Sequence, residues 1–196
     1  MNMKIGAVLL AAGRSERFGS DKLLADFGGR PMICRALEAM RALPAARKCV
    51  VAGSDNVAVL AGEYGFAVIR NHEPQLGQSH SIRLGVLAME DLDAVLLMVG
   101  DQPRLTRSSL ARLAEAFGAS EKGIACLRDE THMGNPAIFA KTYFQQLLAL
   151  SGDRGAKGIL KAHPDDLLVV PCVHRGELAD ADTPQELETM ESAQNE

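Results

Sequence analysis

Three cations follow the first apolar run of the chain, which spans residues 4–10. The run leads into small and cationic residues: Leu10, Ala11, Ala12, Gly13, Arg14, Arg17 and Lys22. Backbone N–H groups in a loop of small residues can surround phosphate oxygens, and Arg and Lys supply compensating charge. Open α/β sheets bind ligands at the carboxyl ends of their strands. The pattern favours a loop that binds a nucleoside triphosphate; the alternative is an ordinary strand–helix connection with solvated cations.

A carboxylate follows the most apolar run, residues 94–99. Gly100 and Asp101 come next, and Pro103 ends any strand formed there. An Asp at this place points into the crevice above a parallel sheet and can bind Mg²⁺, which prefers one or two carboxylates together with phosphates and water. On its own, an Asp in a strand-ending turn is an equally good interpretation.

A second acidic pair, Asp180 and Asp182, precedes Thr183 and Pro184. Carboxylates at i and i+2 lie on the same side of an extended segment. Thr183 or Asp182 could instead cap a helix that opens at Pro184. Capping leaves the other Asp without a role, so we expect Asp182, with Asp180, to join Asp101 in a site for Mg²⁺, or for Mn²⁺ in its place.

Polar residues also gather between residues 71 and 81. Asn71, Ser79 and Ser81 lie near the start of an expected helix, where free N–H groups and hydroxyls suit a nucleotide or its acceptor. Simple N-capping by either serine is the alternative. His72, His80 and His132 show no metal-ligand spacing, and we expect them to be structural or exposed.

Two glycine-containing segments complete the candidates, one at residues 134–136 and one at residues 152–157. Both suit plain turns, and both suit the lining of an acceptor pocket. Residue chemistry alone leaves the choice open. The acceptor-binding candidates are Gly134, Asn135, Pro136, Asp153 and Gly155.

Apolar runs alternate with helix-like segments along the chain. We expect strands at residues 4–10, 48–52, 67–69, 94–99, 124–127, 137–139 and 167–170. Helices are expected at residues 31–43, 56–64, 79–89, 107–117, 142–150, 156–162 and 184–190, with Thr106 as an N-cap. The alternation predicts an α/β fold of Rossmann-like type, a mostly parallel sheet with helices on both faces. We expect one domain, residues 1–196, with a polar tail after about residue 190.

Composition and motifs exclude other classes. A net charge of −4 argues against a nucleic-acid-binding protein, and no apolar run approaches the roughly 20 residues of a membrane span. The chain has neither a P-loop nor a Gly-x-Gly-x-x-Gly motif. Its four scattered cysteines include no Cys-x-x-Cys pair, which suits buried thiols in a reducing cytoplasm.

Five motifs together resemble the molybdenum cofactor cytidylyltransferase family. They are Leu10-Ala11-Ala12-Gly13 with Arg17 and Lys22, Gly100-Asp101-Gln102-Pro103, Gly134 with Pro136, Gly152-Asp153 with Gly155-Ala156, and Asp180 with Asp182-Thr183-Pro184. The resemblance implies the nucleotide-diphosphate-sugar transferase (GT-A-like) fold. It implies transfer of CMP from CTP to molybdopterin carrying molybdenum, with release of pyrophosphate. A molybdoenzyme or its maturation chaperone is an implied partner.

The resemblance also bears on specificity and mechanism. Ala12 favours cytosine, because related guanylyltransferases typically have Gly there, whereas Asn135 and His80 depart from the family's usual His and Ser on the acceptor side. An anionic acceptor phosphate needs no strong base, so we expect positioning and charge stabilisation by Arg17, Lys22 and Asp101. The alternatives are nucleotidyl transfer to a sugar phosphate, a GTP-using cofactor guanylyltransferase, and a non-catalytic carrier of nucleotide or molybdopterin.

Overall fold

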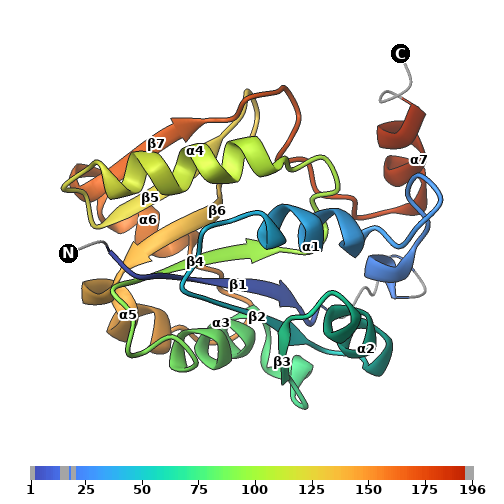
Figure 1. Ribbon diagram of the computed structural model, residues 1–196, viewed down its shortest axis with the longest axis horizontal. Helices are drawn as coiled ribbons and strands as arrows, with labels where there is room; N and C mark the ends of the chain where they lie inside the picture. The colour runs from blue at the N-terminus through green and yellow to red at the C-terminus, as the bar shows by residue number, and fades with distance from the viewer. Residues whose placement is uncertain (1–2, 14–17, 19–20, 193–196) are drawn as a thin grey trace.

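The computed structural model describes residues 3–13, 18 and 21–192. Within them, seven strands form one sheet in the order β3-β2-β1-β4-β6-β5-β7 (Figure 1). The strands are β1 (Ile5–Ala11), β2 (Arg47–Ala52), β3 (Ala67–Arg70), β4 (Ala94–Val99), β5 (Ile124–Arg128), β6 (Met133–Ala140) and β7 (Leu167–Pro171). Neighbouring strands are parallel except that β6 runs antiparallel to both β4 and β5. The predicted mostly parallel sheet is confirmed.

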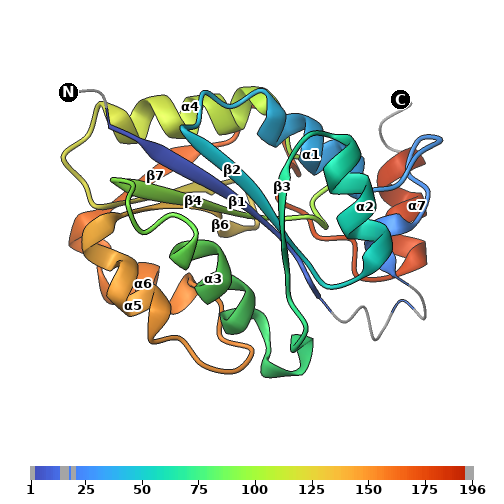
Figure 2. The same cartoon turned by 60° about the horizontal axis from the view of Figure 1, so that its bottom comes forward.

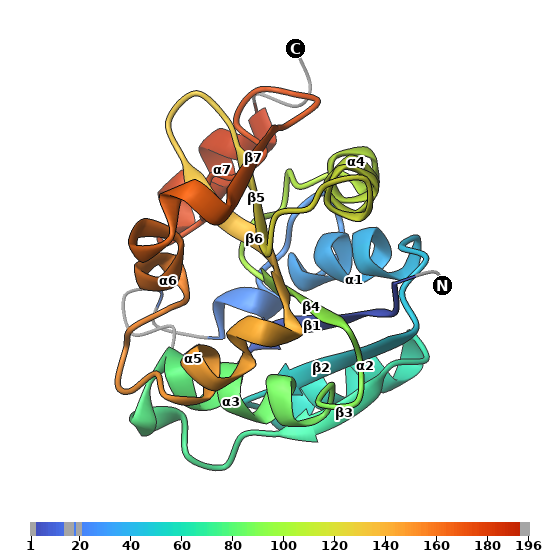
Figure 3. The ribbon, with the colours of Figure 1, turned by 90° about the vertical axis from the view of Figure 1, so that its left-hand side faces the viewer.

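Helices cover both faces of the sheet. They are α1 (Ile33–Arg41), α2 (Asp55–Glu63), α3 (Gln78–Leu87), α4 (Arg107–Gly118), α5 (Phe144–Leu148), α6 (Lys157–Ala162) and α7 (Pro184–Ser192). Buried residues of α1, α2, α4 and α7 belong to one apolar core, and those of α3, α5 and α6 belong to a second. The end-on views separate the two layers (Figures 2 and 3). None of the described helices has the length and apolar character needed to cross a membrane.

The central strands are apolar on both sides because each side faces a core. In β1, Ala7 and Leu9 enter the first core, whereas Val8 and Leu10 enter the second. β4 alternates in the same way, since successive side chains of a strand point to opposite faces. The two strands are parallel neighbours, so their carboxyl ends, followed by Ala12 and Asp101, meet at one edge of the sheet.

Two predicted helices differ from those in the structure. The helix expected from Pro31 begins at Ile33, because Pro31 forms a bridge with Asp26 instead. The helix expected at residues 142–150 divides into a 3₁₀ turn, Lys141–Tyr143, and the short α5. The predicted N-cap of α4 is correct: the Thr106 hydroxyl accepts from the Ser109 N–H.

Residues 134–136 lie inside a strand, not in a turn before it as the sequence suggested. β6 starts at Met133, which pairs with Arg128 of β5, and the next register pair is Ala137 with Cys126. The register shift leaves more residues on β6 than on β5, as in a bulge. A bulge tolerates Pro136, which has no N–H to donate.

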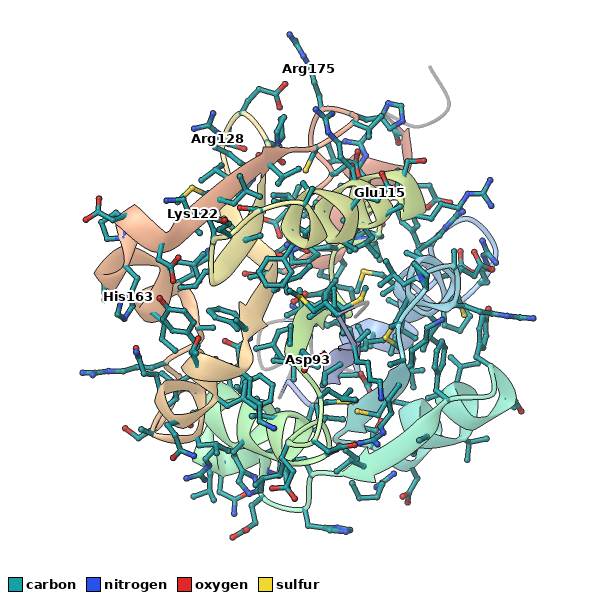
Figure 4. All side chains as sticks on the ribbon, turned by 60° about the vertical axis from the view of Figure 1, so that its left-hand side comes forward. Asp93, Glu115, Lys122, Arg128, His163 and Arg175 are labelled. Carbon is teal, nitrogen blue, oxygen red and sulfur yellow. The ribbon has the colours of Figure 1, made fainter. Side chains whose placement is uncertain are left out.

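The outer surface carries charged side chains in the ordinary way. Lys122, Arg128 and Arg175 lie at the periphery of the ribbon (Figure 4). Arg175 pairs with Glu130 at 3.0 Å although its side chain is 92% exposed. Such exposed ion pairs contribute little to the stability of the fold.

Candidate active site

A cleft of about 370 Å³, here the first cleft, opens at the carboxyl ends of β1 and β4. The sequence-predicted residues that line it are Leu10, Ala12, Gly13, Lys22, Ser81, Gly100, Asp101, Asp153 and Asp182. They come from segments far apart in the sequence. The edge of the sheet at which the sequence placed the ligand is therefore hollow and polar.

Lys22 links the two predicted acidic positions. Its Nζ lies 2.6 Å from Asp101 Oδ2 and 3.0 Å from Asp182 Oδ1. Burial lowers the Lys22 pKa, but the Asp101 and Asp182 carboxylates outweigh burial, so the pKa is raised overall. Lys22 is therefore a protonated ammonium group held between two carboxylates inside the cleft.

Asp101 keeps unused bonding capacity. Its Oδ1 is buried and has no hydrogen-bond partner among the described residues. A buried acceptor without a donor is costly, and such an exception calls for a ligand or an ion. Asp101 and Asp182 line the same cleft, so two carboxylates border the space in which a ligand would lie.

The carboxylates fit a cation that keeps substrate and water ligands. In the part of the chain that is described, no group of three or more His, Cys, Asp and Glu side chains is arranged to hold a metal. Mg²⁺ typically takes one or two protein carboxylates and completes its shell with phosphates and water. Asp101 and Asp182 match that donor set.

Asp180 lies apart from Asp182. Its Oδ1 accepts from Gln102 Nε2 at 3.0 Å, and burial followed by the charge of Asp101 raises the Asp180 pKa. Gln102 Nε2 also donates to the Leu178 carbonyl at 3.1 Å. Asp180 is therefore bonded to Gln102, whereas Asp182 is bonded to Lys22.

Thr183 caps α7, whereas Asp182 lines the first cleft. The Thr183 hydroxyl accepts from Glu186 N at 3.2 Å, and Glu186 Oε2 accepts from Thr183 N at 2.9 Å. This is a capping box, in which the first and fourth residues satisfy each other's backbone donors. Between the two predicted caps, the structure selects Thr183.

Neither serine is the N-cap of α3, so the capping alternative does not hold. The N-cap is Gly77, whose φ of 81° lies in the left-handed region that glycine adopts readily. A Cβ on Gly77 would collide with Gly152. Ser79 N instead donates to the Gly152 carbonyl at 3.2 Å. The Gly152–Asp153 segment therefore packs against the start of α3, a contact that no local pattern contains.

Asn71 and Ser81 form a buried polar network at the cleft. Glu73 N donates to Asn71 Oδ1 at 2.9 Å, which fixes the amide so that Nδ2 donates to Ser81 Oγ, also at 2.9 Å. His80 Nδ1 lies 2.9 Å from the same Oδ1. Ser81 lines the first cleft, whereas Ser79 is buried with no partner for its hydroxyl among the described residues.

A second cleft of about 330 Å³ adjoins the first. The two share Leu10, Gln78, Val99, Asp101 and Asp153. Of the predicted acceptor residues, the second cleft is lined by Gly134, Asn135, Asp153 and Gly155, and Asp180 lines it as well. Pro136, although described, lines neither of these clefts. Two compartments thus meet at Asp101.

Gln78, which was not among the predicted site residues, lines the second cleft together with Lys157 of the candidate segment 152–157. His132 also lines this cleft, and its side chain is 44% exposed, in agreement with the expectation that it is structural or exposed. Lys157 and Lys22 are each the first residue of a helical element that follows a glycine-containing segment, and that parallel was the available signal. A Cβ on Gly155 would collide with Gln78 Oε1, so this glycine allows the close approach. Arg14 and Arg17 lie outside the described residues.

The chain belongs to the MobA-like NTP transferase domain family, whose sequence model matches residues 7–167. The family resemblance suggested by the motifs is thereby confirmed, and the chain is a member of a nucleotidyltransferase family. A probable molybdenum cofactor guanylyltransferase of Pyrococcus horikoshii is 29% identical over 81% of this chain and 79% of its own length.

Other relatives agree at the level of fold and domain. The bifunctional protein GlmU of Sphingopyxis alaskensis is 35% identical over 62% of this chain, and this chain spans only 28% of that protein. The crystal structure of Rv0371c from Mycobacterium tuberculosis superposes with a TM-score of 0.81 at 24% identity, covering 98% of this chain and all of that one. The same protein in complex with manganese gives a TM-score of 0.75. The predicted Rossmann-like nucleotidyltransferase fold is confirmed.

Proposed function

We propose that this chain transfers CMP from CTP to the terminal phosphate of molybdopterin carrying molybdenum, giving molybdopterin cytosine dinucleotide and pyrophosphate. The observation that carries the proposal is the pair of adjoining clefts that share Asp101. The first cleft contains Lys22 and has room for a triphosphate. The second contains the predicted acceptor residues. An attack in line with the leaving pyrophosphate requires two substrates to meet at such a junction.

In this proposal the first cleft binds the nucleotide through the chain's small and polar residues. Leu10, Ala12, Gly13 and Gly100 form an apolar wall that lets the ligand come close to the backbone. Ser81, oriented by Asn71, offers a hydroxyl to the nucleotide. Lys22, and Arg14 and Arg17 by their charge, offset the negative charge of the phosphates. Ala12 is the residue that favours cytosine.

Catalysis then rests on positioning and charge. A terminal phosphate is already anionic near neutral pH, so no side chain needs to remove a proton. Lys22 is held protonated and stabilises negative charge on the leaving pyrophosphate. Asp101 and Asp182 would hold Mg²⁺ or Mn²⁺, which when bound supplies charge neutralisation across the phosphates.

The acceptor occupies the second cleft in this proposal. Asn135, Asp153 and Asp180 supply polar groups there, and Lys157 adds a cation. We also propose that residues 1–196 work as one domain, since residues of a single sheet line both clefts. A cytoplasmic location is part of the same hypothesis. Delivery of the product to a molybdoenzyme or its chaperone is part of the same hypothesis.

A second nucleotide and a second acceptor must be tested against CTP and molybdopterin. The Pyrococcus relative is named a guanylyltransferase, so GTP is the natural competitor. A sugar phosphate, the alternative acceptor that the motifs left open, is tested beside molybdopterin; this chain spans about 25–29% of the length of its GlmU relatives. A carrier without catalytic activity would bind nucleotide and release no pyrophosphate.

The test is pyrophosphate release with CTP, GTP or UTP in turn. Each reaction contains either molybdenum-loaded molybdopterin or a sugar phosphate, with and without Mg²⁺ or Mn²⁺. Metal-dependent release with CTP and molybdopterin, and little with GTP, is expected. Preference for GTP or for a sugar phosphate would replace the proposed substrate, and tight nucleotide binding without release would favour a carrier.

A further inference from the structure

Asp21 immediately precedes Lys22 and joins it to a distant part of the chain. Asp21 Oδ1 accepts from Leu23 N at 3.3 Å and so caps the 3₁₀ turn Lys22–Leu24. The other oxygen, Oδ2, accepts from the Ser54 hydroxyl at 2.7 Å, across 33 positions of sequence. The second bond is not needed for the cap, because one oxygen already makes it. It connects the Lys22 turn to the start of α2.

Ser54 is itself fixed from two directions. Its Oγ accepts from Val57 N at 3.4 Å and caps α2. Its carbonyl accepts from Arg70 Nη1 at 2.8 Å, and the same guanidinium pairs with Asp55 at 2.7 Å. Arg70 is the last residue of β3. The partner that Asp21 contacts is thus tied to both a helix and a strand.

Gly53, which directly follows β2, packs against Ala12, a residue that lines the first cleft. A Cβ on Gly53 would come within 2.9 Å of the Ala12 backbone, too close for any residue but glycine. The segment Gly53–Ser54 after β2 is therefore in contact with the segment after β1 that lines the first cleft. Ser54, held by its bonds to α2 and to Arg70, therefore contacts the residue next to Lys22.

We propose that the Asp21–Ser54 hydrogen bond positions Lys22 for its work on the triphosphate. This inference rests on the role proposed above for Lys22. Asp21 and Ser54 line no cleft described here, so both act through Lys22 and not on substrate. A displacement of about 1 Å in a reacting group can lower a rate a hundredfold, so a support of this kind has measurable value.

A residue exchange separates positioning from helix capping. Asp and Ser are both good N-caps, so Ser54→Asp keeps a cap on α2 but places two carboxylates face to face. The exchange Asp21→Ser with Ser54→Asp restores a hydroxyl–carboxylate bond with the donor and acceptor reversed. Ser54→Thr is the matched control, because it keeps both the cap and the hydroxyl donor.

We expect Ser54→Asp to lower kcat/KM for the nucleotide by about tenfold or more, the size of effect that one charge-assisted hydrogen bond supports. The exchange should recover activity to within about twofold of wild type, and Ser54→Thr should match wild type. Thermal unfolding of all four proteins shows that each is folded.

The closing experiment repeats Ser54→Asp in a Lys22→Ala background and measures both turnover and the Kd for CTP. If Asp21 and Ser54 act through Lys22, Ser54→Asp adds no further loss there. An equal loss with and without Lys22, or an exchange that folds and stays inactive, would overturn the inference. Wild-type turnover and CTP affinity in Lys22→Ala alone would instead contradict the proposed function, on which the inference depends.

Discussion

Asp101 is a partly buried carboxylate and Glu177 is a buried one, and they differ in how many of their hydrogen-bonding positions are occupied. Glu177 is 1% exposed and is surrounded by donors within the described chain. Its Oε2 accepts from the N–H and the hydroxyl of Thr106 at 2.9 and 2.8 Å. Its Oε1 accepts from Ser109 Oγ at 2.8 Å and His174 N at 2.7 Å. Every bonding direction is used, at the positive end of α4.

Asp101 has the opposite balance. One of its oxygens meets Lys22, and the other has no partner among the described residues. A fully bonded carboxylate stabilises the fold, whereas an incompletely bonded one retains affinity for a ligand. The difference assigns Glu177 to structure and Asp101 to chemistry, and each assignment can be broken by mutation.

The largest expected effect is that of Asp101→Asn on turnover. Loss of the charge removes the main carboxylate of the clefts, and we expect kcat to fall by about a hundredfold or more. Stability should change far less than turnover: the ion pair with Lys22 is lost, but Lys22 keeps Asp182 and the buried Oδ1 no longer carries charge. Asp93→Asn is the matched control at the other end of β4, where Asp93 accepts from Lys4 N. Unchanged pyrophosphate release in Asp101→Asn would contradict a role for Asp101 in the reaction.

Glu177→Gln should have the reverse signature. Its amide would turn an N–H₂ group toward donors, and the backbone N–H of Thr106 or His174 would then lose its acceptor. We expect the free energy of unfolding to fall by about 1–3 kcal/mol, measured by urea titration. Turnover of the folded enzyme at low temperature should fall far less than in Asp101→Asn. A stable but inactive Glu177→Gln would show that Glu177 does more than support the fold.

Neighbouring residues at the start of α7 sharpen the same contrast. Thr183→Ala removes a helix cap and should cost about 1 kcal/mol of stability. Asp182→Asn removes a cleft charge beside Lys22 and should weaken nucleotide turnover with little change in stability. Parallel thermal melts and kinetics check both. A reversal of the two patterns would mean that Asp182 is the cap in solution.

The smallest effect concerns Asp166, another well-bonded carboxylate. The Tyr143 hydroxyl, at 2.6 Å, and the Gly123 N–H hold the Asp166 pKa below its usual value. Because the folded-state pKa is lowered, the resulting stability is present above the unfolded pKa and is lost as pH falls through the folded pKa. Tyr143→Phe keeps the ring that contacts His163. It should cost about 0.5 kcal/mol at pH 7, and this difference should vanish in acid.

The sequence predicted the parts of this molecule that depend on local pattern. The apolar runs of β1 and β4 lie in two cores, and Thr106 is a cap that needs only its own helix. The placement of Asp101 and of the loop after β1 at one edge of the sheet also followed, since neighbouring parallel strands end there; the Lys22–Asp101 ion pair was not predicted.

What the sequence did not predict depends on contacts between distant segments. Residues 134–136 belong to β6 because the register with β5 shifts there. Ser79 does not cap α3 because the helix already begins at Gln78, and its N–H donates to the distant Gly152 carbonyl. Gln78 lies in the second cleft through a close approach that Gly155 permits, and Lys157 packs against Gly134. No local propensity contains such information.

The most direct test is Mn²⁺ binding in the presence of CTP, followed by electron paramagnetic resonance. The comparison is made on wild type, Asp101→Asn and Glu177→Gln. We expect wild type and Glu177→Gln to bind Mn²⁺ alike, and Asp101→Asn to bind it at least about tenfold more weakly, since ligands and their charge set metal affinity. Equal binding by Asp101→Asn would contradict the claim that the incompletely bonded carboxylate is the chemical one.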